Sequence, residues 1–84
     1  FAGRDFLKRE LERLGCRVTP SQANFLLFKP PGPARRIFEQ LLARGVIVRP
    51  LAGYGLPDHL RVSMGTEEEN RFFLNALQEV LDHG

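Results

Sequence analysis

The chain has 84 residues, with 12 lysines and arginines against 10 aspartates and glutamates, and a formal net charge of +2. A chain of this length forms one small domain, and so small a charge, spread along the sequence without a run of one sign, predicts no basic patch for nucleic acid. A single cysteine excludes an internal disulfide and a paired-thiol metal site, and no apolar run approaches the roughly 18 to 20 residues of a membrane span.

The first predicted element is a helix over residues 5–14. Apolar residues recur at helical spacing from Leu7 to Leu14, with charged residues on the other faces. Gly15 is typical of a helix C-terminus because glycine accepts a positive φ without a clash at Cβ. Cys16 follows it as a small residue that we expect to be buried or half-buried.

Two strands are expected next. Residues 17–20 are long enough only for an edge strand or a connector, and Pro20 ends any part in a ladder. Residues 24–29 are mostly apolar and are bounded by polar residues and prolines, which is typical of a short strand buried on both faces.

A helix and a third strand follow the proline-rich break at residues 30–33. Pro33 suits the first turn of this helix, whose apolar stripe spans residues 34–42, and Gly45 ends it. The β-branched run at residues 46–49 predicts a strand.

The fourth strand is predicted at residues 59–64, where apolar and polar side chains alternate. One face carries Leu60, Val62 and Met64, and the other carries His59, Arg61 and Ser63. The loop before it, at residues 50–58, contains glycines and prolines and is interpreted as a flexible turn in which Tyr54 closes over the core.

Thr66 and Glu69 form a capping box that predicts the start of the last helix. Its buried stripe runs from Phe73 to Leu81. The order is therefore helix, strand, strand, helix, strand, strand, helix. This order predicts an α+β fold with a small mixed β-sheet and the helices packed on one face.

The predicted sheet has a second face that no helix of the chain covers. If Leu60 and Val62 pack against the helices, pleating places Arg61 on the opposite face, and the same alternation places Arg49 there. Guanidinium groups match carboxylates and phosphates bidentately, so the pair is a candidate anion site. Residues 24–29 would add an apolar patch beside this charge, which indicates that another domain covers the face and leaves a cleft.

The sequence also allows a plainer interpretation. Arginines at strand ends commonly pair with nearby acids, for which Asp58 or Glu67 could serve. His59 and His83 have no partners at metal-ligand spacing and are expected in solvent. Ser63 has no base near it in the sequence, so a nucleophile is not predicted.

Two blocks of sequence resemble the C-terminal part of histidinol-phosphate aminotransferases. The first is residues 45–50 (Gly-Val-Ile-Val-Arg-Pro) with residues 54–57 (Tyr-Gly-Leu-Pro). The second is residues 60–70 (Leu-Arg-Val-Ser-Met-Gly-Thr-Glu-Glu-Glu-Asn). Upstream, residues 20–27 (Pro-Ser-Gln-Ala-Asn-Phe-Leu-Leu) resemble the strand at the start of the same domain. The likeness covers nearly the whole chain, and the two arginine blocks are its specific part.

The resemblance implies that residues 1–84 are the small C-terminal domain of a longer fold-type I enzyme that depends on pyridoxal 5′-phosphate. The large domain of the same chain would hold this cofactor through a lysine, and the full enzyme would be a cytoplasmic homodimer. Neither Lys8 nor Lys29 lies in a matching motif. This chain alone is therefore expected to bind no cofactor and to catalyse nothing.

The resemblance also implies roles for three residues. Arg61 and Arg49 would bind the phosphate of histidinol phosphate in one half-reaction and a carboxylate of glutamate or 2-oxoglutarate in the other. Asn24 would border the site. No residue of the chain would be catalytic.

Two other functions stay open on the sequence. Threonine-phosphate decarboxylases and some aromatic or aspartate aminotransferases share this small domain and an equivalent arginine. Alternatively, a stand-alone α+β binding or regulatory module would use the same sheet face for a partner.

Overall fold

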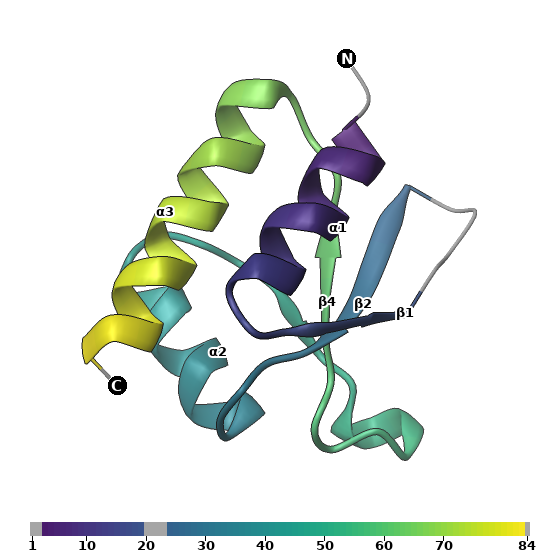
Figure 1. Cartoon of the computed structure of the whole chain (residues 1–84). Coiled ribbons are helices and arrows are strands. Elements are labelled where there is room, and N and C mark those ends of the chain that lie inside the picture. The colour runs from purple at the N-terminus through teal and green to yellow at the C-terminus, as the bar shows by residue number, and fades with distance from the viewer. Residues whose placement is uncertain (1–2, 20–23, 84) are drawn as a thin grey trace.

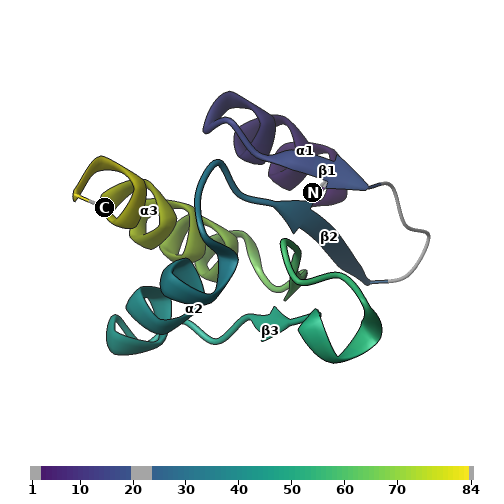
Figure 2. The ribbon, with the colours of Figure 1, turned by 90° about the horizontal axis from the view of Figure 1, so that it is seen from below.

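Three helices pack on one side of a four-stranded sheet in the computed structural model, which describes residues 3–19 and 24–83 (Figure 1). In chain order the elements are α1 (Gly3–Arg13), β1 (Arg17–Thr19), β2 (Phe25–Lys29), α2 (Ala34–Ala43), β3 (Arg49–Pro50), the 3₁₀ helix η1 (Ala52–Tyr54), β4 (Leu60–Ser63) and α3 (Glu67–His83). Helix α3 contacts both other helices, and Figure 2 shows α1 and α2 on either side of it. None of the helices in these ranges is long and apolar enough to cross a bilayer.

The sheet has the strand order β1-β2-β4-β3, and each of these pairings is antiparallel. The α+β class with helices on one face is confirmed, but the prediction of a mixed sheet is wrong. Strands β2 and β3, which α2 joins, do run in the same direction. They are not neighbours, however, because β4 lies between them and pairs with both. The last strand in the chain is thus a central one.

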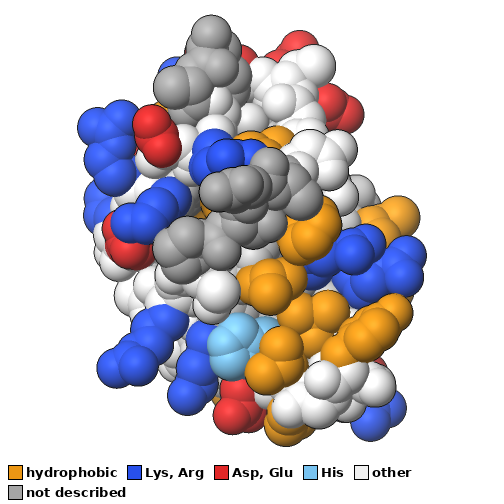
Figure 3. All heavy atoms as spheres, turned by 90° about the vertical axis from the view of Figure 1, so that its right-hand side faces the viewer, with side chains coloured by type: hydrophobic (Ala, Val, Ile, Leu, Met, Phe, Trp, Pro, Cys, Tyr) orange, Lys and Arg blue, Asp and Glu red, His pale blue; other side chains and the backbone are white. Residues whose placement is uncertain are grey.

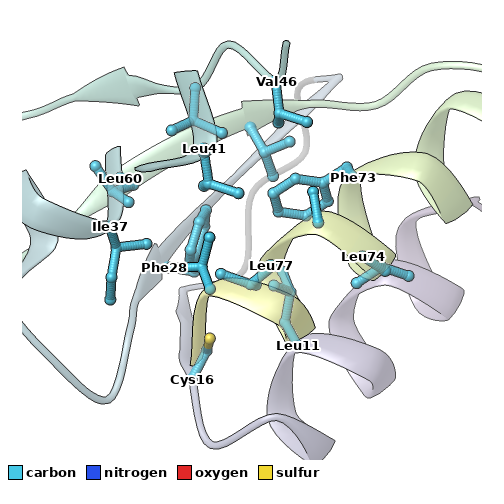
Figure 4. Packing of buried hydrophobic residues seen from close by; sticks show 14 of the residues in the cluster. Leu11, Cys16, Phe28, Ile37, Leu41, Val46, Leu60, Phe73, Leu74 and Leu77 are labelled. Atoms are coloured by element: carbon cyan, nitrogen blue, oxygen red, sulfur yellow. The ribbon is translucent and has the colours of Figure 1, made fainter. Parts of the chain in front are cut away.

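The hydrophobic core lies between the helices and one face of the sheet (Figure 4). Phe28 of β2 and Phe73 of α3 meet edge to face, with 6.0 Å between their ring centroids. Leu60 and Val62 of β4 are buried with them. Burying one large apolar side chain contributes about 1.5 to 3 kcal/mol. A one-residue slip of β4 would expose these two side chains and bury Arg61, so the register of this strand is strongly specified.

Residues 46–48 were predicted to be part of a strand, and this prediction is wrong. Val46 donates its N–H to the carbonyl of Leu41 at 2.9 Å, so this group caps α2 instead of joining a ladder. Strand β3 is therefore limited to Arg49 and Pro50 at the sheet edge, where a residue without an N–H is tolerated. The predicted alternation of buried and exposed side chains is present although no ladder forms here. Val46 and Val48 are buried, and Ile47 between them is 80% exposed.

The predicted helix ends are largely confirmed. Gly15, the second residue after the end of α1, has φ 91°. Thr66 and Glu69 form the capping box, in which the Glu69 N–H donates to Thr66 Oγ1 at 3.1 Å and the Thr66 N–H donates to Glu69 Oε1 at 2.9 Å. Pro33 stands at the N-cap of α2 rather than in its first turn. Strand β1 is an edge strand as predicted, and Pro20 lies outside the described residues.

Candidate functional site

Arg49 and Arg61 stand directly opposite each other on β3 and β4. Both line one hollow of about 380 Å³ at the β3 edge of the sheet, next to α2. The other residues around it are Phe38, Ile47, Val48, Pro50 and Ser63. The structure therefore brings together the two arginines that the sequence placed on one face. Ser63, considered from sequence only as a nucleophile, adds an exposed hydroxyl donor beside them.

No carboxylate neutralises this pair within the described part of the chain. The ion pairs there all involve other basic residues. Glu67, one of the two acids expected to pair with the arginines, instead accepts a hydrogen bond from Arg71 at 3.1 Å. Asp58, the other acid, makes no ion pair with any described residue. Like charges directly opposite each other destabilise a sheet. An anion bound between the arginines would remove that repulsion as well as add hydrogen bonds.

The outer face of the sheet, meaning the face turned away from the helices, carries four basic residues. Arg17 of β1 is opposite Lys29 of β2, and Arg61 of β4 is opposite Arg49 of β3, with no acid in the described strands. Figure 3 shows this side of the molecule, with hydrophobic side chains in the middle and Lys and Arg side chains to both sides. The even spread of charge along the sequence does not show this grouping, because neighbouring strands bring together residues that are far apart in the chain.

The middle of the outer face is apolar. Phe25 and Leu27 of β2 are half-buried there, whereas Leu26 and Phe28, which face the helices, are fully buried. The strand was predicted to be buried on both faces, and among the described residues only the face towards the helices is fully buried. Ile47 adds to the exposed apolar surface at the edge of the arginine hollow. An apolar patch rimmed by charge is typical of an interface or a ligand groove.

Asn24, the third residue expected at the site, does not line the arginine hollow. It is exposed, it directly precedes β2, and its backbone carbonyl accepts a hydrogen bond from the Met64 N–H at 2.9 Å. Its place at the site stays a prediction. Residues 20–23, which carry the rest of the same motif, lie outside the described residues.

Two side chains lie elsewhere than the sequence predicted. Tyr54 was expected to close the loop over the core, but it is 74% exposed in η1, and Leu51 is the buried residue of that loop. His59 was expected in solvent. It is half-buried, and its Nδ1 atom has no hydrogen-bond partner within the described residues. His83 is exposed, as predicted.

Neither lysine is placed to hold a cofactor at the arginine hollow. Lys8 pairs with Glu12 on α1 at 3.1 Å, and Lys29 is exposed at the end of β2. Clusters of three or more potential metal ligands do not occur in the described ranges. Cys16 is buried in the core, and this burial raises the pKa of its thiol to about 12, so the group stays neutral near neutral pH.

Asn70 supports the site in a way that the sequence analysis missed. This buried side chain accepts a hydrogen bond from the Gly65 N–H at 3.0 Å, and its amide donates to the Gly65 carbonyl at 3.5 Å. The two contacts tie the end of β4 to α3, and so they hold the strand that carries Arg61. The sequence does indicate that Asn70 is buried, because it lies three residues before Phe73 and so shares the apolar stripe of the helix.

Comparison with known proteins places this fold in a family. A model of the family described as aminotransferase class I and II matches residues 2–77. The chain belongs to this aminotransferase family. The resemblance carried by the two arginine blocks is thereby confirmed. A histidinol-phosphate aminotransferase from Nitratidesulfovibrio vulgaris is 56% identical to the chain over 81 residues, which are 96% of this chain and 22% of the relative.

Solved structures agree with this membership. The histidinol-phosphate aminotransferase from Clostridium acetobutylicum superposes with a TM-score of 0.90 at 26% identity, over 98% of this chain and 26% of the other. A decarboxylase from Sulfurospirillum multivorans superposes with a TM-score of 0.85 at 30% identity, over 94% of this chain and 24% of the other. The aminotransferase chain described here thus spans about a quarter of the length of these two proteins.

Proposed function

We propose that the chain is the substrate-binding small domain of a pyridoxal-phosphate-dependent aminotransferase. The enzyme would transfer an amino group between histidinol phosphate and 2-oxoglutarate or glutamate in histidine biosynthesis. Residues 1–84 would form the C-terminal part of a longer cytoplasmic chain that acts as a homodimer. The observation that carries this proposal is the pair Arg49 and Arg61, which share one hollow without a neutralising acid. The name of the 56% identical relative supports the choice of substrate.

The arginine pair would bind the anionic end of the substrate and so orient it. Each guanidinium can form two parallel hydrogen bonds with a phosphate or a carboxylate, so the same pair suits both half-reactions. Arg49 and Arg61 would not react themselves. They would hold the substrate by its phosphate or carboxylate, the group that the arginines bind and that the reaction leaves unchanged.

The cofactor does not fit the residues described here. A fold-type I site needs a lysine at the cofactor, and neither Lys8, paired with Glu12, nor Lys29 lies at the arginine hollow. The large domain of the longer chain would therefore hold the cofactor and supply the chemistry of the reaction. Its apolar surface would cover the outer face of the sheet and turn the hollow into a cleft.

The test of this role is Arg61→Lys in the enzyme encoded by the complete coding sequence. A point charge replaces a bidentate fork, so the KM for histidinol phosphate should rise about tenfold to a hundredfold, as expected for a hydrogen bond to a charged group of about 1.5 to 3 kcal/mol. Arg9→Ala is the matched control, because Arg9 is exposed on α1 and does not line the hollow. An unchanged KM in Arg61→Ala would show that Arg61 is a surface residue without a role.

The proposal also predicts that the 84-residue chain alone is inactive. Mixed with the cofactor and reduced with borohydride, it should acquire no label at Lys8 or Lys29, and a label at either would contradict the proposal. The coding sequence upstream of residue 1 should encode a few hundred residues that include the cofactor lysine. A reading frame that holds this chain alone would favour a binding module instead.

A second candidate is a decarboxylase with the same small domain. The superposition on the decarboxylase from Sulfurospirillum multivorans favours it. A decarboxylase acting on threonine phosphate would use the same arginines for the same kind of anion. Assaying the complete enzyme with histidinol phosphate and with threonine phosphate separates the two reactions, because amino transfer needs 2-oxoglutarate and decarboxylation releases carbon dioxide.

A further inference from the structure

Arg61 is held by an aromatic ring rather than by an acid. Its Cζ atom lies over the ring of Phe25, 4.9 Å from the centroid. The two residues are diagonal neighbours on the outer face, since Leu27 is directly opposite Arg61 and Phe25 is directly opposite Ser63. A diagonal contact of this kind is within reach of an arginine and an aromatic side chain. Phe25 is only half-buried, so the helix-side core does not depend on it.

A second arginine of the chain shows what is different about this contact. Arg71 lies over the ring of Phe6, 5.4 Å from the centroid, but it also donates a hydrogen bond to Glu67 at 3.1 Å. Its donors are thus partly used by a carboxylate. Arg61 contacts the Phe25 ring, but it makes no ion pair with a carboxylate among the described residues. A ring carries no oxygen acceptor, so it attracts the cation and leaves the guanidinium N–H donors available for an anion.

The ring also opposes a displacement that the sheet would otherwise favour. Arg49 is directly opposite Arg61, and repulsion between the two charges would push the long side chains apart into solvent. Attraction to Phe25 of β2 keeps the Arg61 guanidinium against the outer face of the sheet instead of in solvent. An arginine ordered before the anion arrives loses less conformational entropy on binding.

We propose that Phe25 is a positioning residue for Arg61, whose ring keeps the guanidinium ordered with its hydrogen-bond donors free for the anion. This role rests on the proposed function of the arginine pair as the anion site. It predicts that an aliphatic residue at position 25 weakens anion binding although it leaves both charges in place.

The experiment compares the chain with Phe25→Leu, Phe25→Ile and Phe25→Trp, and with Phe6→Leu as the matched control. Isoleucine is included because β-branched residues suit strands, and tryptophan keeps an aromatic face. The order parameter and chemical shift of the Arg61 Nε–H group are measured by NMR in the absence of anion. Inorganic phosphate is then titrated at low ionic strength, where a surface charge pair is least screened.

In Phe25→Leu and Phe25→Ile the Arg61 Nε–H signal should lose its ring-current shift, and its order parameter should fall below about 0.6. The dissociation constant for phosphate should rise about two- to fivefold, the factor that corresponds to an exposed cation–π contact. Phe25→Trp should keep both properties near the wild-type values. Phe6→Leu, which removes the contact to Arg71, should change neither.

The results that would overturn the proposal differ from those that would overturn the proposed function. Equal order of Arg61 in the wild type and in both aliphatic variants, or unchanged phosphate affinity in them, would refute the role of Phe25 while the anion site stands. An unchanged KM for histidinol phosphate in Arg61→Ala of the complete enzyme would refute the anion site, and the role of Phe25 with it.

Discussion

Replacing Asn70 with alanine tests whether α3 holds the strand that carries Arg61. Asn70 is 3% exposed, and it bridges the N–H and the carbonyl of Gly65, two residues after the end of β4. The substitution leaves the Gly65 N–H without this partner and leaves space where the amide stood. We therefore expect the whole domain to lose stability and the end of β4 to loosen first.

The magnitude follows from the geometry of the two contacts. The 3.0 Å bond from the Gly65 N–H has good length and contributes about 0.5 to 1.5 kcal/mol, whereas the 3.5 Å contact is too long to add much. The space left by the buried amide costs about 1 kcal/mol more. The sum of about 2 kcal/mol corresponds to a fall in Tm of about 8 to 16 °C, at about 4 to 8 °C per kcal/mol for a domain of this size.

The assay is urea and thermal unfolding followed by far-ultraviolet circular dichroism, because the chain has no tryptophan. Asn75→Ala is the control, since Asn75 is an exposed asparagine in the same helix and should change stability by less than about 0.5 kcal/mol. Asn70→Leu fills the space without making the bonds. Wild-type stability in Asn70→Ala would refute the reasoning, because that variant lacks the bonds to Gly65 and adds no apolar side chain that could offset their loss. Hydrogen exchange should locate the effect, with faster exchange at the Met64 amide.

Further predictions concern the capping box and the buried thiol. Thr66→Ala should cost about 1 kcal/mol of unfolding free energy in the same urea assay, and a loss within error would show that the cap is not needed. Hydrogen bonds from the Thr66 backbone and side chain lower the pKa of Glu69 from 4.5, so its contribution is present above that value and lost as the pH falls through the lowered pKa. The stability difference between wild type and Glu69→Gln should therefore shrink in acid, and a constant difference would contradict this. Burial raises the pKa of Cys16 from 9.0 to about 12, so the stability that it contributes is present below pH 9.0 and lost as the pH rises towards 12. The folded thiol should react with a disulfide reagent at pH 8 far more slowly than the urea-unfolded thiol, and equal rates would refute its burial.

The helix ends were predictable because each has a local cause. The hydroxyl of Thr66 and the carboxylate of Glu69 lie three residues apart, which is the spacing that a capping box needs. Gly15 was predictable as a helix end because glycine has no Cβ and so accepts a positive φ. The faces of β4 were predictable for a similar reason, since alternation along one strand fixes which side each residue of the strand occupies.

The extent of β3 was not predictable, because the end of α2 and the sheet compete for the same backbone N–H groups. Residues 46–48 have the composition of a strand, but the N–H of Val46 is already bonded to the carbonyl of Leu41 at the end of α2. Pro50 then offers no N–H on the other side. The pattern of burial was correct at these positions, while the ladder depended on hydrogen-bond partners that only the fold supplies.

The candidate site was predictable in part. Alternation placed Arg49 and Arg61 on one face, and the fold places them in one hollow. The basic outer face was missed because Arg17 and Lys29 join it through pairing of β1 with β2, which the spacing of charges along the sequence does not show. The contact of Phe25 with Arg61 was missed for the same reason, since it depends on the register between β2 and β4.

The central place of β4 has a consequence for how the protein is made. On the ribosome, β1 and β2 emerge together and can pair, but β2 must wait for residues 60–63 before its other edge is covered. Until then its apolar side chains and open backbone groups face the chaperones and neighbouring chains of the cell. Helix α3 follows β4 in the chain, so the helix that packs against both α1 and α2 emerges later still.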